Sequence, residues 1–145
     1  MRGFLQRHRR IALDTSIFIY ELEATPRYAA FTAPIFSWIE ETRHSAVTST
    51  ITMAELLVQP YRNANQDQVN QFYGLLTTYP HLEWIAPDLE IADLAARFRA
   101  QHRLRIPDAL HAATAAGCQA TGFITNDAVF RRVEGFETLV LQELV

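Results

Sequence analysis

Apolar residues recur along the chain in two patterns that predict two kinds of element. Short runs rich in apolar side chains are typical of buried strands, whereas apolar residues spaced three and four apart are typical of amphipathic helices. Strands are expected at residues 10–14, 46–49, 82–85, 122–125 and 138–141. Helical patterns separate most of these runs, so the sequence predicts an α/β fold with a mostly parallel sheet covered by helices.

The expected helices carry start and stop signals. They are placed at residues 17–21, around Ile35, Trp38 and Ile39 with Pro26 and Pro34 at the entry, at 51–58, at 67–78, from Asp88 onward and at 109–116. Ser49 or Thr50 is expected to cap the helix at 51–58. Pro60 is expected to stop the same helix, because proline lacks the N–H that continues a helix.

The composition is that of one globular domain. The chain has 145 residues, of which 49% are hydrophobic and 20% are charged, and these are ordinary proportions. No repeat or linker interrupts the pattern, so residues 1–145 are expected to form a single domain. Cys118 is the only cysteine, which excludes an internal disulfide and favours a reducing cytoplasm. No apolar run approaches the ~18 residues that span a bilayer, so no membrane association is expected.

The charged residues exclude several classes of phosphate-handling protein. Net charge is −3, and all thirteen basic residues are arginines. Haloacid-dehalogenase-like phosphatases and response-regulator receivers need a lysine, which this chain lacks. The glycine-rich loop of dinucleotide-binding proteins and the G-K-[ST] motif of nucleotide triphosphatases are absent as well. The arginines are clustered and suit phosphate oxygens, although a preference for arginine codons explains the clusters equally well.

Two aspartates follow predicted strands. Asp14 comes at the end of the first strand, and Asp127 comes just past the fourth strand. The carboxyl ends of parallel strands share one edge of the sheet, and this edge is where α/β proteins place their functional groups. Taken singly, each has an ordinary structural explanation, because Asp14 could be a turn residue and Asp127 could cap the next helix.

Two further acids lie on predicted helices. Glu55 has the helical spacing to share a face with Ile51, Ala54 and Val58, and an ionised carboxylate on an apolar face needs a partner, a cation or a path to water. Asp108 follows a proline at the start of a helix, where capping is as good an explanation as catalysis. A helix that starts near the carboxyl edge of the sheet would bring Asp108 toward the other acids.

Gathered carboxylates repel one another, which raises their pKa values unless positive charge intervenes. The chain has no lysine, and no arginine adjoins any of the four acids in sequence. Mg²⁺ or Mn²⁺ is therefore the expected counter-charge, since these ions prefer carboxylate oxygen. Such a site can activate water against a phosphodiester without a protein nucleophile. His111 lies one helical turn after Asp108 and could touch the site, although helical histidines are more often structural.

Four short motifs in this order and spacing resemble the PIN-domain nucleases, and most closely the VapC-like toxins of prokaryotic toxin–antitoxin pairs. They are residues 13–20 (LDTSIFIY), 49–56 (STITMAEL), 107–115 (PDALHAATA) and 124–127 (ITND). The resemblance runs from the first strand to the last. It implies a three-layer α/β/α sandwich with a central, mostly parallel sheet, and a Mg²⁺- or Mn²⁺-dependent endoribonuclease that is usually a homodimer inhibited by a small antitoxin.

The resemblance also assigns roles to residues. Asp14, Glu55, Asp108 and Asp127 match the acidic quartet that performs catalysis and binds metal. Thr15, Thr125 and Asn126 match small polar positions that hydrogen-bond the acids or bound water. Independently of the resemblance, the clustered Arg97, Arg99 and Arg103 are the arginines expected to guide RNA. The alternative is a non-catalytic PIN-like module that binds RNA or a protein, and the intact quartet argues against it.

Overall fold

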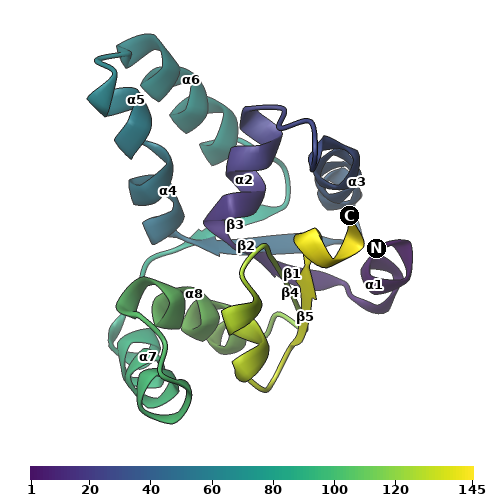
Figure 1. The fold of residues 1–145 in the computed structure, drawn as a ribbon, viewed down its shortest axis with the longest axis vertical. Coiled ribbons are helices and arrows are strands. Elements are labelled where there is room, and N and C mark those ends of the chain that lie inside the picture. Colours follow the sequence, from purple (N-terminus) through teal and green to yellow (C-terminus); the bar gives the residue numbers. More distant parts are fainter.

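The computed structural model describes residues 1–145 and contains a single five-stranded sheet (Figure 1). The strands are β1 (Arg10–Leu13), β2 (Ser45–Ser49), β3 (Leu82–Ile85), β4 (Gly122–Thr125) and β5 (Glu137–Val140). Their order across the sheet is β3-β2-β1-β4-β5, and every neighbouring pair is parallel. The α/β fold with a parallel sheet, predicted from the sequence, is therefore confirmed.

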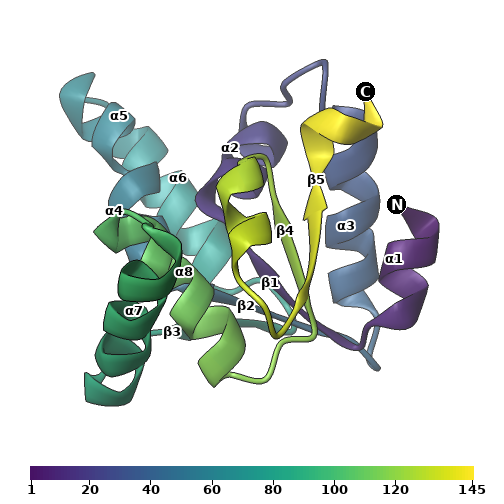
Figure 2. The same ribbon diagram turned by 60° about the horizontal axis from the view of Figure 1, so that its bottom comes forward.

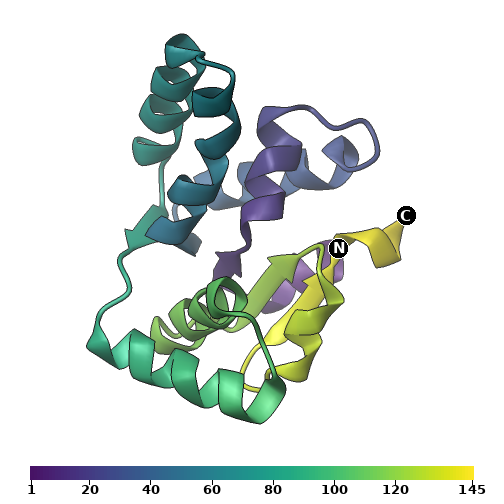
Figure 3. The same ribbon diagram turned by 60° about the vertical axis from the view of Figure 1, so that its left-hand side comes forward.

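Helices cover both faces of the sheet and make three layers (Figure 3). They are α1 (Arg2–Arg7), α2 (Thr15–Leu22), α3 (Ala29–Glu40), α4 (Thr50–Leu56), α5 (Val58–Arg62), α6 (Gln66–Thr77), α7 (Leu89–His102) and α8 (Ile106–Gly117), with short 3₁₀ segments η1 (Ala128–Arg132) and η2 (Leu141–Leu144). No helix is both long and apolar enough to cross a membrane.

The alternation of side chains along the strands gives the molecule two cores. Ile11 and Leu13 of β1 belong to the core under α1, α2 and α3. Ala12, between them, faces the opposite way and packs with residues of α7 and α8. Successive strand residues point to opposite faces, and a parallel sheet is buried on both. The apolar runs at the centre of the sheet are therefore strands with two buried sides, whereas the edge strands β3 and β5 expose Glu83 and Glu137.

Three of the predicted helix boundaries were wrong, all at prolines. The helix expected at 109–116 begins at Ile106 and includes Pro107 in its first turn. Pro60 does not stop the helix at 51–58: the break comes at Leu57, and Pro60 is the third residue of α5. In the first turn of a helix the N–H has no intrahelical partner, so proline loses nothing there. Pro34 lies inside α3 rather than at its entry. The complete burial of Ile35 and Ile39 outweighs the single backbone hydrogen bond that Pro34 removes.

The topology brings three chain segments to one edge of the sheet. The N–H of Asp14 continues the β1–β4 pairing by donating to the Ile124 carbonyl oxygen at 3.0 Å. The Ser49 side chain accepts from the N–H of Ile51 and starts α4 directly after β2. Asp127 caps η1 just past β4. Because the strands are parallel, all three segments leave the sheet at its carboxyl edge.

Candidate active site

The four predicted acids lie around one cleft of about 290 Å³ at the carboxyl edge of the sheet. They come from four parts of the chain: the end of β1, helix α4, the first turn of α8 and the loop after β4. Arg105, Tyr20 and Asn126 line the same cleft. The fold thus gathers side chains that are more than a hundred positions apart in the sequence.

Asp14 is the most firmly positioned of the acids. The Thr125 hydroxyl donates to its Oδ2 at 2.6 Å, and the N–H of Thr15 donates to its Oδ1 at 2.6 Å. The hydroxyl of Ser16 adds a longer bond of 3.4 Å to Oδ2. Burial is the largest influence on this carboxyl group and raises its pKa above the ordinary value, while the bond from Thr125 opposes the rise. Asp14 is thus a fixed carboxylate short of positive charge.

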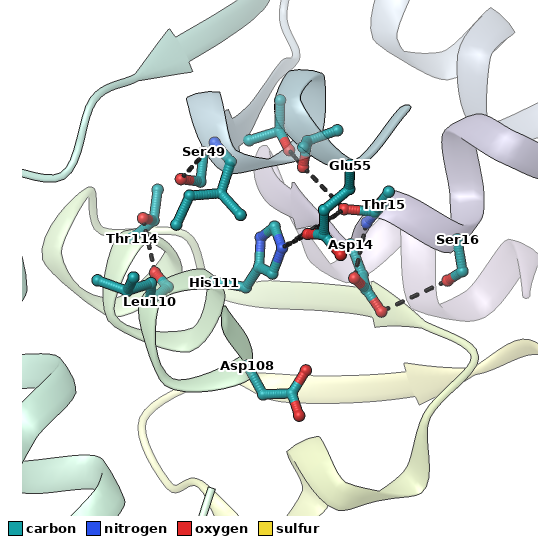
Figure 4. Close-up of polar contacts among 12 residues, drawn as sticks. Asp14, Thr15, Ser16, Ser49, Glu55, Asp108, Leu110, His111 and Thr114 are labelled. Atoms are coloured by element: carbon teal, nitrogen blue, oxygen red, sulfur yellow. Dashed lines mark hydrogen bonds and ion pairs between the residues drawn. The ribbon is translucent and has the colours of Figure 1, made fainter. Parts of the chain in front are cut away.

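Glu55 is held by a buried histidine (Figure 4). Nε2 of His111 donates to Oε1 of Glu55 at 2.7 Å, and the Thr15 hydroxyl donates to the same oxygen at 3.0 Å. The His111 side chain is only 3% exposed, whereas that of Glu55 is 44% exposed. The hydrogen bond from His111 is the main cause that lowers the pKa of Glu55.

Glu55 lies on the exposed side of α4, not on the buried apolar face predicted from its helical spacing. Ala54 and Val58, the residues expected to share a buried face with it, are exposed, and α4 instead buries Thr52 and Leu56. Glu55 therefore reaches the cleft from the exposed side of α4 rather than from an apolar face. Thr52 belongs to a chain of hydroxyls in which it contacts Thr48 at 2.7 Å and Thr15 at 3.2 Å.

Asp108 has an arginine partner that the sequence argument overlooked. Nε of Arg105 donates to Oδ2 of Asp108 at 3.2 Å. No arginine adjoins an acid in sequence, but Arg105 pairs with Asp108 because a spacing of three residues at a helix start brings two side chains together. The Asp108 side chain is 13% exposed and that of Arg105 is 81% exposed. The guanidinium thus remains largely in water at the mouth of the cleft.

Asp127 and its neighbours complete the cleft. Asp127 is exposed, and its Oδ1 accepts from the N–H of Val129 at 2.9 Å while its own N–H donates to the Thr125 hydroxyl at 3.0 Å. Asn126 bonds none of the acids: its Nδ2 donates to the Tyr20 hydroxyl at 2.8 Å, and its Oδ1 accepts from the N–H of Gln142. Thr125 therefore ties two acids together, and Asn126 braces the loop.

The donor chemistry of the cleft fits a hard divalent cation. Four carboxylates face one arginine, and oxygen donors of this kind are what Mg²⁺ and Mn²⁺ prefer. The arrangement itself is not that of a closed cage, since no three His, Cys, Asp or Glu side chains are placed to hold one ion together. Glu55, Asp108 and Asp127 each engage a protein partner instead. The residues fit the ion by chemistry, because Glu55, Asp108 and Asp127 each keep one carboxylate oxygen that makes no hydrogen bond to the protein.

The three arginines predicted to guide RNA do not line this cleft. Arg97 lies 3.5 Å from Asp93 of the same helix, and Nε of Arg99 donates to the Leu104 carbonyl oxygen. Arg103 adopts a left-handed conformation (φ 54°) just after α7. Arg105 is the arginine at the cleft. The position of Arg105, three residues before Asp108, could have predicted its place at the cleft. The position of His111, one helical turn after Asp108, could have predicted the same for that histidine.

The fold and this cleft define an α/β protein with an acid-lined cleft at the carboxyl edge of a parallel sheet. The model of the PIN domain matches residues 11–135. The chain therefore belongs to the PIN-domain family, as the resemblance of its motifs indicated. No curated protein sequence matches it significantly.

Solved structures share the fold over nearly the whole chain. VapBC2 from Rickettsia felis, bound to a promoter DNA fragment, superposes with a TM-score of 0.73 at 18% identity, covering 90% of this chain and 98% of that one. DNA-bound VapBC from Salmonella typhimurium gives 0.72 at 20% identity, covering 91% and 98%. VapBC-5 of Mycobacterium tuberculosis, from the VapBC family of toxin–antitoxin systems, gives 0.56 at 25%, covering 92% and 98%. These matches confirm the PIN-like fold.

Proposed function

We propose that the chain is a metal-dependent endoribonuclease that hydrolyses RNA phosphodiester bonds, and that it acts as the toxin of a toxin–antitoxin pair. The observation that carries the proposal is the convergence of Asp14, Glu55, Asp108 and Asp127 on one cleft. Membership of the PIN-domain family supports it. RNA, rather than DNA, is the substrate that the resemblance to VapC-like toxins favours.

Asp14, Asp108, Asp127 and Glu55 are the proposed ligands of Mg²⁺ or Mn²⁺. A bound divalent ion supplies activation of a water molecule and stabilisation of charge at the leaving oxygen. Thr125 and Thr15 hold the Asp14 carboxylate in one orientation. His111 does the same for Glu55 and acts as a positioning residue. The exposed guanidinium of Arg105 is placed to bind a substrate phosphate at the mouth of the cleft.

A direct experiment is cleavage of labelled single-stranded RNA by the purified chain with Mg²⁺, with Mn²⁺ or with a chelator, and of DNA of the same sequence. Cleavage of RNA that needs the metal and is lost in Asp14→Asn is the expected result. Asp67→Asn is the matched control, because Asp67 is an exposed acid on α6 away from the cleft. Equal cleavage by Asp14→Asn and wild type would reject the assignment.

A non-catalytic RNA-binding module is the alternative. It is favoured by one observation: Glu55 and Asp108 already have cationic or proton-donating partners in the cleft. If wild-type protein binds RNA but leaves it intact with either metal over prolonged incubation, this alternative replaces the nuclease.

We propose further that the chain works in the cytoplasm as a homodimer with a protein antitoxin. The similar structures from Rickettsia felis and Salmonella typhimurium are named as VapBC assemblies, which supports a protein partner of this kind. Light scattering of the purified chain tests the dimer. Loss of RNA cleavage on co-expression with a protein encoded beside it tests the antitoxin.

A further inference from the structure

The N-terminal helix α1 lies outside the residues matched by the PIN domain, which begin at residue 11. It is nevertheless firmly attached to the sheet. Phe4 and Leu5 are buried, and a Cβ on Gly122 of β4 would lie 2.7 Å from the ring of Phe4. His8, just after the helix, bridges Thr121 and Glu137 with two contacts of 2.7 Å. The positions of the residues on α1 are therefore set by packing.

A pocket of about 590 Å³ lies between α1 and α3, which run side by side at one end of the molecule (Figure 2). Three arginines line it: Arg2 from α1, Arg9 before β1 and Arg43 from the loop before β2. Glu41 is the one acid in its wall. Because β1 and β2 begin here and end at the acidic cleft, the pocket and the cleft occupy opposite edges of the sheet.

Half of the ten arginines outside this pocket are paired with carboxylates, whereas the three in the pocket are not. Five arginines elsewhere form ion pairs with carboxylates: Arg7 with Glu137, Arg10 with Glu83, Arg97 with Asp93, Arg105 with Asp108 and Arg131 with Glu143. Arg2, Arg9 and Arg43 make no side-chain hydrogen bond or ion pair, and Glu41 instead lies 3.5 Å from Nδ1 of His44. The pocket thus concentrates positive charge in a molecule whose net charge is −3.

An aromatic pair fixes the loop that carries Arg43. The ring of His44 stacks on that of Trp38, with centroids 4.0 Å apart and planes 9° from parallel. Nδ1 of His44 also donates to the carbonyl oxygen of Trp38 at 2.9 Å, and Trp38 is only 8% exposed. The backbone on both sides of the pocket is therefore pre-organised, while the guanidinium groups are free to bind an anion.

We infer that this pocket is a second RNA-binding site, in which Arg2, Arg9 and Arg43 bind backbone phosphates of the substrate away from the acidic cleft. The inference rests on the proposed function for the identity of the polyanion. Guanidinium groups match phosphate oxygens in geometry and charge. β1 has four residues, and at about 3.3 Å per residue the two sites are more than ~13 Å apart. A dinucleotide cannot occupy both, whereas a longer RNA can.

The test is binding of a labelled single-stranded RNA of about 20 nucleotides, measured by anisotropy with a chelator present, so that no cleavage is involved. Wild type is compared with Arg9→Gln/Arg43→Gln over a range of salt concentrations. Two lost phosphate contacts lower the slope of log affinity against log salt by about 1.4, which is about 25-fold in affinity at 0.1 M salt. Arg62→Gln/Arg132→Gln is the control of equal charge change, and its slope is expected to match wild type.

Three results would overturn the inference. They are an unchanged slope in Arg9→Gln/Arg43→Gln, an equal loss in the control variant, or displacement of RNA by polyglutamate as effectively as by unlabelled RNA of equal charge. Cleavage of a dinucleotide should be the same in both variants and in wild type. If wild type binds RNA through this pocket but cuts nothing, the proposed catalysis fails and the inference stands. If wild type cuts RNA but the salt dependence of binding is unchanged in Arg9→Gln/Arg43→Gln, the inference fails and the proposed catalysis stands.

Discussion

The charged side chains at the two edges of the sheet differ in how many hydrogen bonds they make to the protein. At the carboxyl edge each acid is bonded to the protein, and Asp14 alone accepts bonds from Thr15, Ser16 and Thr125. At the amino edge Arg2 and Arg9 make no side-chain hydrogen bond or ion pair; Arg2 begins and Arg9 follows helix α1, which is attached to the sheet by the buried Phe4 and Leu5. Side chains held in one orientation suit catalysis, which needs one geometry. Side chains without partners suit electrostatic binding of a polyanion, which tolerates many geometries. The comparison predicts large, site-specific effects at the first edge and graded, salt-dependent effects at the second.

The largest expected effect is that of Asp14→Asn on RNA cleavage. Removing one central carboxylate from a metal-dependent site should lower the cleavage rate by about a thousand-fold or more. The fold should survive, because burial raises the pKa of Asp14 and its ionised form therefore costs stability as pH rises through the ordinary value. A melting curve without metal, at neutral pH, should place the variant at or above wild type. A large drop in melting temperature would contradict this account of Asp14.

A smaller loss is expected when the support of Glu55 is removed. His111→Gln should lower cleavage by about 10- to 100-fold, as is usual for residues that orient a metal ligand. Because the hydrogen bond from His111 lowers the pKa of Glu55, the acidic limb of the pH–rate profile should move to higher pH in the variant. A merely structural histidine would leave that limb in place. Profiles of wild type and variant with the same metal decide between the two.

An effect on stability is expected where α1 meets the sheet. In Gly122→Ala the new Cβ would lie 2.7 Å from the ring of Phe4 and 3.0 Å from that of His8. Overpacking of this kind costs about 1–3 kcal/mol in the free energy of unfolding. Gly74→Ala is the control, since nothing lies within 4 Å of a Cβ there. Denaturant unfolding measures both, and equal stability of the two variants would show that α1 is loosely attached.

The smallest expected effect is that of the ion pair between Arg10 and Glu83. The hydrogen bond from Arg10 lowers the pKa of Glu83 below its ordinary value of 4.5, so the pair stabilises the fold above that pH and is lost as pH falls through the lowered value. Both groups reach solvent, so Glu83→Gln should cost less than about 1 kcal/mol at pH 7. Wild type and variant should converge in acid. A difference that persists there would assign the effect to packing.

The sequence predicted the strands almost residue by residue, because β1, β2 and β4 are short apolar runs that are buried on both faces, and the edge strands β3 and β5 are half-buried runs of the same length. It predicted the acids at strand ends for the same reason: Asp14 directly follows one such run, and Asp127 lies two residues past another. It did not predict α1, whose only buried residues are Phe4 and Leu5 among basic and polar neighbours. A helix of six residues has too short a pattern to reveal a period.

The parts of the cleft that sequence reasoning missed depend on contacts between distant elements. Thr15, Glu55 and His111 meet only because α2, α4 and α8 converge, and no local spacing encodes that meeting. The apolar neighbours of Glu55 misled the prediction, because α4 has apolar residues on nearly every side while only Thr52 and Leu56 are buried. Arg105, by contrast, was within reach of local reasoning through its spacing from Asp108.

The most direct test of the central claim is Mn²⁺ binding by the purified chain. Electron paramagnetic resonance measures the concentration of the free ion in this experiment. The four-acid cleft predicts that wild type and Asp67→Asn bind Mn²⁺ alike, and that Asp14→Asn and Asp108→Asn each lose most of the affinity. Equal binding by wild type and the two cleft variants would contradict it.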